Sequence, residues 1–216
     1  MPNKNILLVE PGYKNKYPPL GLMKIAQYHG ENGKRDNVRF IKGMDNSAFD
    51  NHWDRIYVTS LFSFEWKKTE ETIDFAIRLA NGDSSRVFVG GIAASLMTEQ
   101  FNEIPRWAGV RFIRGLLDKS PAESLMLDEF SEELYSTDYD STPIELLTPD
   151  YSILEHTDYE YPVRDAYFTY ASRGCVRSCK FCGVPKLEGA QRDTDSISAI
   201  VNSIEKLYGP KKDLIL

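Results

Sequence analysis

Ile6-Leu7-Leu8-Val9 is an uninterrupted apolar run near the start of a chain of 216 residues. A run of this length is typical of a strand that is buried on both faces of a sheet. Helical patterns lie at about residues 20–31, 67–81 and 93–103, among further apolar runs. This alternation predicts an α/β domain built on a doubly wound, Rossmann- or flavodoxin-like parallel sheet of five strands. The other four strands are expected at residues 38–41, 56–59, 87–89 and 110–113.

Ligands of such sheets bind at the carboxyl ends of the strands. Here these ends lead into three distinctive loops, at residues 10–21, 60–66 and 90–91. Gly90-Gly91 suits the close approach of a ligand, but it also suits a simple strand-to-helix turn, since glycine takes backbone angles that other residues avoid. The aromatic side chains of residues 62–66 fit either a planar ligand or packing on a neighbouring domain.

The formal net charge of −6 is unevenly distributed along the chain. Residues 118–165 carry fourteen acidic side chains against Lys119 and Arg164, so this segment is −12 and the remainder is +6. An acidic run that contains several prolines is typical of a solvated linker. We therefore expect a first domain at residues 1–117, a linker at 118–165 and a second domain at 166–216. The mildly basic remainder does not indicate a nucleic-acid partner.

Composition is consistent with an ordinary globular protein. With 42% hydrophobic and 27% charged residues, the chain can bury a substantial core. No apolar run approaches the length of a membrane span, and the first residues lead into a strand instead of a signal-peptide core. We therefore expect a cytoplasmic protein without a membrane partner.

The sharpest chemical signal is a CxxxCxxC motif formed by Cys175, Cys179 and Cys182, the only cysteines in the sequence. An all-cysteine iron–sulfur cluster normally takes four thiolates, so three ligands leave one iron open to a substrate. Flanking glycines let the backbone pass close to a cluster. Deprotonated sulfur is favoured by the basic residues around the motif, which are Arg173, Arg177, Lys180 and Lys186.

Two other interpretations of the motif stay open at this point. The spacing i, i+4, i+7 could mark one buried face of a helix without any metal. A structural zinc ion would need a fourth ligand, and the histidines on offer are His29, His52 and His156, none at finger spacing. A disulfide framework is disfavoured by the odd cysteine count.

A CxxxCxxC motif with an aromatic residue just before its third cysteine resembles the radical S-adenosylmethionine (radical SAM) enzymes. The resemblance implies that Cys175, Cys179 and Cys182 hold a 4Fe-4S cluster whose open iron is chelated by S-adenosylmethionine. It further implies that Phe181 lies near the adenine and that reductive cleavage yields a 5′-deoxyadenosyl radical. An electron donor such as flavodoxin or ferredoxin and a small-molecule substrate of unknown identity are implied as partners.

The first domain resembles the cobalamin-binding domain that precedes the catalytic barrel in one large branch of this family. The likeness rests on residues 17–22, 89–91 and 114–115, and it implies cobalamin near Ser60, Gly90 and Gly91. Residues 149–154 look like the interdomain linker of the same branch. A DxHxxG motif, which supplies a histidine ligand to cobalt, is not found in this sequence. Cobalt would then be bound without a protein histidine, or cobalamin binding has been lost. We interpret His29 as a helix-surface or capping residue near Gly30.

The second domain begins with an apolar and aromatic strand at residues 166–171, followed by the cysteine loop. Thr194-Asp195-Ser196 offers helix N-caps, Gly209-Pro210 stops that helix, and residues 213–216 start another strand. Such a unit cannot close a (β/α) barrel by itself. We therefore expect a fragment of a longer radical SAM protein that cannot catalyse alone, with its cysteine loop poorly ordered or held by packing contacts instead of by a cluster.

Two function classes follow. In the first, the chain is the N-terminal portion of a radical SAM enzyme. In the second, it is a non-enzymatic α/β module that binds cobalamin or another small molecule and carries a structural metal site. A methylthiotransferase is less favoured, because the N-terminal domain of that group brings its own three cysteines and this one has none.

Overall fold

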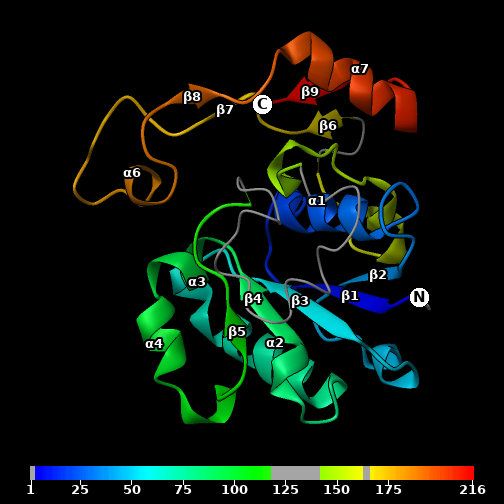
Figure 1. Cartoon of the computed structure of the whole chain (residues 1–216), viewed down its shortest axis with the longest axis vertical. Coiled ribbons are helices and arrows are strands. Elements are labelled where there is room, and N and C mark those ends of the chain that lie inside the picture. The colour runs from blue at the N-terminus through cyan, green and yellow to red at the C-terminus, as the bar shows by residue number, and fades with distance from the viewer. Residues whose placement is uncertain (1–2, 118–141, 163–165) are drawn as a thin grey trace.

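The computed structural model describes residues 3–117, 142–162 and 166–216. Its first part is a parallel sheet with strand order β2-β1-β3-β4-β5 (Figure 1). This order and the parallel pairing of all neighbouring strands confirm the predicted doubly wound α/β fold. The strands are β1 (Asn5–Glu10), β2 (Asn37–Lys42), β3 (Arg55–Thr59), β4 (Val87–Gly90) and β5 (Arg111–Phe112).

Helices cover both faces of the sheet. The α-helices of this part are α1 (Leu20–His29), α2 (Trp66–Leu79), α3 (Ile92–Leu96) and α4 (Thr98–Asn102). Short 3₁₀ turns complete it: η1 (Asn46–Asp50), η2 (Ser63–Glu65), η3 (Ser84–Arg86) and η4 (Pro105–Trp107).

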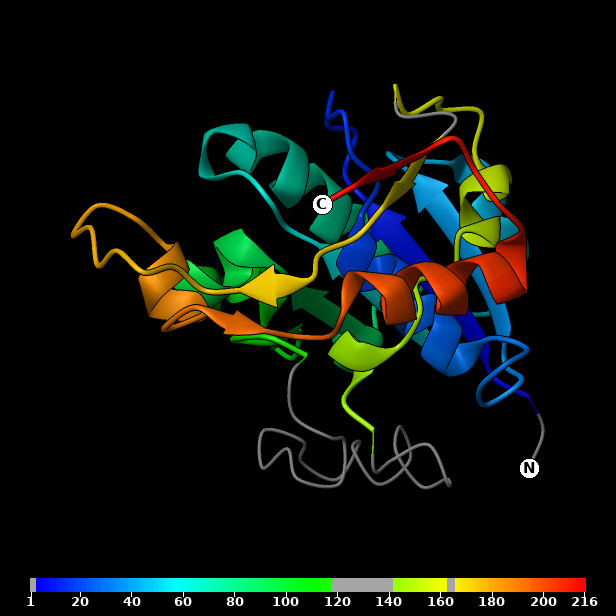
Figure 2. The ribbon, with the colours of Figure 1, turned by 90° about the horizontal axis from the view of Figure 1, so that it is seen from above.

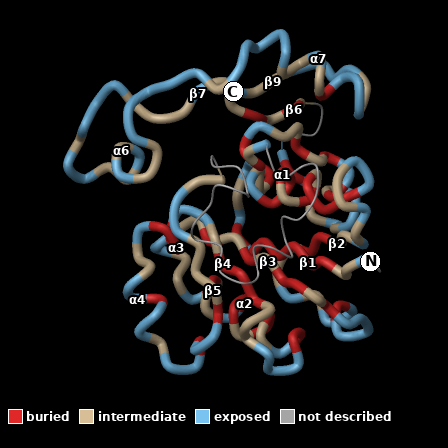
Figure 3. Tube along the Cα trace, viewed as in Figure 1, coloured by how far each residue is buried: buried red, intermediate tan, exposed pale blue. Residues whose placement is uncertain are grey.

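Strand β1 is buried from both sides, because successive side chains of a strand face opposite ways. Leu7 and Val9 pack into the core that includes residues of α2, α3 and α4. Ile6 and Leu8 pack into the opposite core, together with residues of α1. All four are fully excluded from solvent, and Figure 3 shows the buried strands at the centre of this domain.

The helix predicted at residues 93–103 is interrupted at Met97, so α3 and α4 are separate. Thr98 is the first residue after the break. Its hydroxyl donates a hydrogen bond of 2.6 Å to the Ala94 carbonyl, the group that a continuous helix would pair with the amide of residue 98. The two longer helices lie within two residues of their predicted bounds at every end.

Residues 142–162 pack against the domain. They contain η7 (Ile144–Leu146) and η8 (Ser152–His156), and Ile144, Tyr151 and Ile153 are buried against the α1 side of the sheet. The expected linker therefore includes a packed stretch, because its apolar and aromatic residues complete that core. The rest of the acidic run, residues 118–141 and 163–165, lies outside the described residues.

The C-terminal part forms a strand–helix–strand unit on top of α1 (Figures 1 and 2). Strand β6 (Ala166–Phe168) pairs in parallel with β9 (Asp213–Ile215), and α7 (Ile197–Tyr208) connects to β9. As predicted, Ser196 caps α7, its side chain accepting a hydrogen bond of 3.2 Å from the Ala199 amide. Ile204 of α7 and Tyr167 of β6 join the same core as α1.

Between these strands the chain makes an excursion that contains the cysteines. Its two sides meet in an antiparallel pair, β7 (Ser172–Arg173) with β8 (Arg192–Asp193), and α6 (Val184–Leu187) forms one short turn within it. We call residues 174–191 the cysteine loop. Figure 2 shows it extending away from the strand–helix–strand unit, past α3. In the described part of the chain, no helix is both long enough and apolar enough to cross a membrane.

Candidate functional site

The three cysteines lie on the cysteine loop with free, partly exposed thiols. The Cys182 amide donates to the Cys179 carbonyl at 3.1 Å, which closes a turn between them. The Arg177 amide donates to the Cys175 sulfur at 3.4 Å. Phe181 projects from the same turn and is 94% exposed.

This geometry removes one interpretation of the motif. Residues 175–183 form turns and not a helix, and none of the three cysteines is buried. The buried helical face that the spacing allowed is therefore wrong.

The histidines needed for a zinc site are engaged elsewhere. His156 accepts a hydrogen bond from the Phe40 amide, and His52 lies beside Arg86. His29 lies between Asp36 and Tyr57. Three thiols without a neighbouring histidine are the donor set that suits a cluster with one open iron.

The sulfur atoms themselves are not drawn together. Over residues 3–117, 142–162 and 166–216, no three His, Cys, Asp or Glu side chains converge on a point where a metal ion could sit. The residue types and the accessible loop fit a three-thiolate cluster, while the ligand positions of Cys175, Cys179 and Cys182 stay a prediction.

The loop touches the first domain beside α3. A Cβ added to Gly183 would lie 2.8 Å from the Leu96 Cδ1 atom, so the loop backbone is in close contact with that side chain. Helix α3 begins directly after Gly90-Gly91. The structure thus brings the cysteine loop close to the helix that starts at the carboxyl end of β4, where a ligand of the sheet was expected.

At that carboxyl end, close internal contacts connect Ser60 with Gly90 and Gly91. The Ser60 hydroxyl donates to the Gly90 carbonyl at 2.8 Å and accepts from the Ala94 amide at 2.9 Å. Gly91 has a φ of 100°, and a Cβ there would lie 2.4 Å from the Ser60 carbonyl oxygen. The glycine pair therefore serves the strand-to-helix turn, and the cobalamin contacts of these three residues stay a prediction.

The aromatic side chains of residues 62–66 lie partly in the core and partly on the surface. Trp66 packs with Phe101 at a centroid distance of 4.7 Å, whereas Phe62 stacks on Phe64, which is 81% exposed. Tyr13 closes the group by an edge contact with Phe62.

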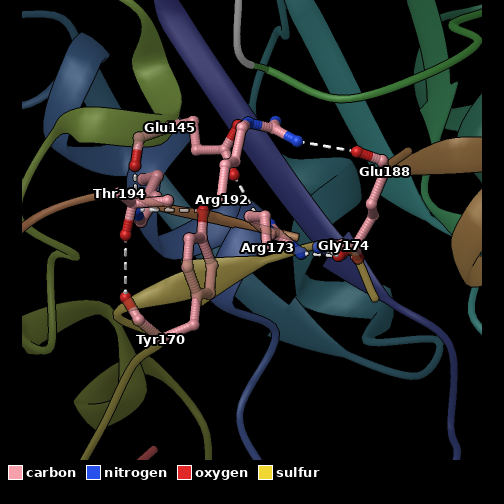
Figure 4. A network of polar contacts seen from close by, with 8 residues as sticks. Glu145, Tyr170, Arg173, Gly174, Glu188, Arg192 and Thr194 are labelled. Carbon is pink, nitrogen blue, oxygen red and sulfur yellow. Dashed lines mark hydrogen bonds and ion pairs between the residues drawn. The ribbon is translucent and has the colours of Figure 1, made fainter. Parts of the chain in front are cut away.

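A polar network that sequence analysis missed lies at the base of the cysteine loop (Figure 4). The Arg173 guanidinium bridges two carboxylates, with its Nε 2.6 Å from Glu145 Oε1 and one terminal nitrogen 3.0 Å from Glu188 Oε1. The same guanidinium lies 3.7 Å from the centroid of the Tyr170 ring. Arg173 is therefore committed to these partners, which corrects the expectation that it serves the sulfur atoms.

Lys24 joins this network from α1. Its ammonium donates to the Glu145 backbone carbonyl and, at 3.2 Å, to the Tyr170 hydroxyl. Burial lowers the pKa of Lys24 to about 8, with Glu145 opposing the shift and Arg173 adding to it. Burial likewise raises the pKa of the Tyr170 hydroxyl above its usual value.

The acidic run predicted solvated carboxylates, but the Glu145 side chain is buried, because the Arg173 guanidinium neutralises its charge.

A second buried cluster fastens the carboxyl ends of β1 and β2. The Lys42 ammonium lies 2.6 Å from Glu10 Oε2, with both side chains almost fully buried. Tyr161 also donates to Glu10, and the Tyr159 ring lies 4.2 Å from the Lys42 ammonium. Burial, opposed by Glu10, lowers the pKa of Lys42. No local pattern pairs residues this far apart, so the sequence carried no signal for this cluster.

His29 also differs from its interpretation as a surface or capping residue. It is 1% exposed, with Nδ1 2.8 Å from Asp36 Oδ2 and Nε2 3.1 Å from the Tyr57 hydroxyl. Burial lowers the pKa of His29, although Asp36 opposes the shift. The polar partners explain why a histidine can end α1 inside the domain.

Comparison with known proteins found one kind of curated relative. The chain is 28% identical over 158 residues to the ribosomal protein uS12 methylthiotransferase RimO of Leptospira biflexa serovar Patoc, in each of two strains. The match covers 69% of this chain and 32% of the relative, so the chain spans about a third of the length of the curated relatives it matches. No protein-family model matches, and neither does any solved structure.

Proposed function

We propose that this chain is the N-terminal portion of a radical SAM enzyme, in which Cys175, Cys179 and Cys182 bind a 4Fe-4S cluster. The observation that carries the proposal is the cysteine loop. It holds three free thiols and an exposed phenylalanine, and ion pairs of Arg173 fix its base to the first domain. The distant similarity to a ribosomal protein uS12 methylthiotransferase, RimO, supports a link to the radical SAM family.

The residues of the loop suit this role. A three-thiolate cluster would pass an electron to S-adenosylmethionine at its open iron, and cleavage of the sulfonium would give methionine and a 5′-deoxyadenosyl radical. Cys175, Cys179 and Cys182 would hold the cluster, and the Arg177 amide would stabilise charge on the Cys175 sulfur. Phe181, already free of the protein core, would lie against the adenine.

The substrate is not identified by these residues. Methylthio transfer is less favoured for this chain, because its three cysteines all lie in one motif. A reductant such as flavodoxin or ferredoxin would supply the electron.

The direct test is anaerobic reconstitution of the chain with iron and sulfide. The sequence predicts a loop that holds no cluster in this fragment, but contacts between Arg173, Gly174 and Glu188 order the base of the loop. We therefore expect the chain alone to bind a cluster, although not to catalyse. We expect a brown, oxygen-sensitive protein with iron and sulfide in cluster stoichiometry, and an electron paramagnetic resonance (EPR) spectrum after reduction that changes when S-adenosylmethionine is added. Replacing any one cysteine by alanine should abolish this signal. Ser178→Ala is the matched control, because it alters the same loop and keeps all three thiols.

Two results would contradict the proposal. One is iron and sulfide content that is the same in Cys179→Ala as in the unaltered chain. The other is zinc that stays bound in air while no iron–sulfur spectrum forms, which would favour the α/β binding module with a structural metal.

The role of Phe181 can be tested separately on the reconstituted chain. We expect Phe181→Ala to retain iron and sulfide but to need about tenfold more S-adenosylmethionine for the same spectral change, because an aromatic stacking contact is lost. Val176→Ala is the control, since Val176 is 81% exposed on the same loop. Equal titrations for both variants would exclude Phe181 as an adenine contact.

A further inference from the structure

We propose that Glu145 is a positioning residue that fixes the cysteine loop to the first domain through Arg173. The inference rests on the proposed function where it concerns the cluster, and on the geometry of the network where it concerns the loop. Glu145 belongs to the segment after the first domain and precedes Arg173 by 28 residues. It neither carries a sulfur ligand nor lies on the loop that it would hold.

Glu145 is itself anchored on two sides by its backbone. Its amide donates to the Leu117 carbonyl at 2.9 Å, just beyond β5. Its carbonyl accepts a hydrogen bond from the Lys24 ammonium on α1. The buried carboxylate therefore extends from a fixed point of the first domain toward the base of the cysteine loop.

Arg173 connects the fixed Glu145 carboxylate to the start of the loop. It is the last residue of β7 and stands two residues before Cys175. The carboxylate of Glu145 at 2.6 Å and the face of Tyr170 hold its guanidinium in one orientation. The start of the cysteine motif is thereby tied to the domain.

Glu188 closes the base from the other end of the loop. One of its oxygens binds the Arg173 guanidinium at 3.0 Å, and the other accepts from the Gly174 amide at 2.8 Å. Its backbone carbonyl accepts from Arg192 at 2.7 Å. Both ends of the loop thus meet at one guanidinium, and the Glu145 carboxylate joins that guanidinium to the first domain (Figure 4). Further out on the loop, Gly183 also contacts Leu96 of α3.

A buried ion pair of this kind is sensitive to loss of one partner, because the remaining charge is left without compensation. Glu145→Gln removes the negative charge and preserves the backbone contacts to Lys24 and Leu117. The substitution therefore isolates the contact to Arg173. Glu70→Gln is the matched control, since Glu70 pairs with Arg106 at 2.7 Å on the exposed surface of α2.

Limited digestion with trypsin measures the loop directly. Arg177 and Lys180 lie between the cysteines, and Glu145→Gln leaves both cleavage sites unchanged. We expect cleavage at these sites to be at least about fivefold faster in Glu145→Gln than in the unaltered chain or in Glu70→Gln. Equal rates, with an unchanged circular dichroism spectrum, would overturn the proposal. Should Glu145→Gln fail to fold, Glu145→Asp provides the comparison, because it keeps the buried negative charge but shortens the side chain that reaches Arg173.

A second measurement separates positioning from simple support of the fold. After anaerobic reconstitution, we expect Glu145→Gln to bind as much iron and sulfide as the unaltered chain, but to show about a fivefold smaller EPR change with S-adenosylmethionine. An unaltered EPR change would overturn a positioning role, whatever the digestion shows. If the unaltered chain binds no iron and sulfide, the proposed function fails, and the trypsin comparison alone decides whether Glu145 fixes the loop.

Discussion

The five-stranded sheet and the cysteine loop are held in place by different forces. In the sheet, Ile6, Leu8 and Ile56 are fully excluded from solvent and pack between layers of helices. On the loop, Val176 is 81% exposed and Phe181 is 94% exposed. Order at the base of the loop comes instead from ion pairs around Arg173 and from the short β7–β8 pair. The region with the proposed chemistry therefore has less apolar burial than the sheet, as is common where function depends on accessible loops.

The sharpest contrast should come from two phenylalanines. Phe40 in β2 is fully buried, whereas Phe181 is almost fully exposed. We expect Phe40→Ala to lower the free energy of unfolding by about 3–5 kcal/mol, because it removes buried area and leaves a cavity. Phe181→Ala should change it by less than about 0.5 kcal/mol. Urea unfolding of both variants measures the difference, and similar losses would mean that the loop shares in the core.

A second comparison uses two glycines with positive φ. Gly91 has a φ of 100° and its added Cβ would meet the Ser60 carbonyl oxygen at 2.4 Å, whereas Gly189 on the cysteine loop has a φ of 74° and open space around it. We expect Gly91→Ala to cost about 3 kcal/mol of stability, from backbone strain and overpacking together. Gly189→Ala should cost about 1 kcal/mol from strain alone. Thermal unfolding at one pH measures both losses of stability. Equal losses would mean that the close approach of Gly91 to Ser60 is not the reason for the glycine.

The smallest effect concerns pH and belongs to the sheet domain. Because burial holds the pKa of His29 below its ordinary value, the unfolded chain binds a proton more readily than the folded one. Stability is then fully present above pH about 6.5 and falls as the pH drops below it, by at most about 1.4 kcal/mol per pH unit. Asp36 also has a lowered pKa, since hydrogen bonds from His29 and the Lys4 amide outweigh its burial. Its contribution is lost only in more acidic solution, below pH about 4.

Substitution of the histidine tests this assignment. We expect His29→Gln to flatten the decline in the free energy of unfolding between pH 7 and pH 5. The control is His52→Gln, because the His52 side chain is largely exposed. If both variants retain the slope of the unaltered chain, another group is responsible for it.

Local pattern was sufficient to predict the fold, whereas the cysteine ligands that it suggested stay a prediction. The apolar run at residues 6–9 predicted β1, and Ser196 and Gly209 bounded α7 as expected. What the pattern could not supply was pairing over long distances. The burial of Glu145 follows from a guanidinium 28 residues further on. His29 was placed at the surface for the same reason, since its partner Tyr57 belongs to another strand.

The central claim is that three thiolates hold a cluster and leave one iron to S-adenosylmethionine. Mössbauer spectroscopy of the chain, reconstituted anaerobically with iron-57 and sulfide, tests it most directly. The account predicts that S-adenosylmethionine shifts the signal of one iron and leaves the three cysteine-bound irons unchanged. Four irons that do not respond to S-adenosylmethionine, or a spectrum that survives Cys175→Ala, would contradict it.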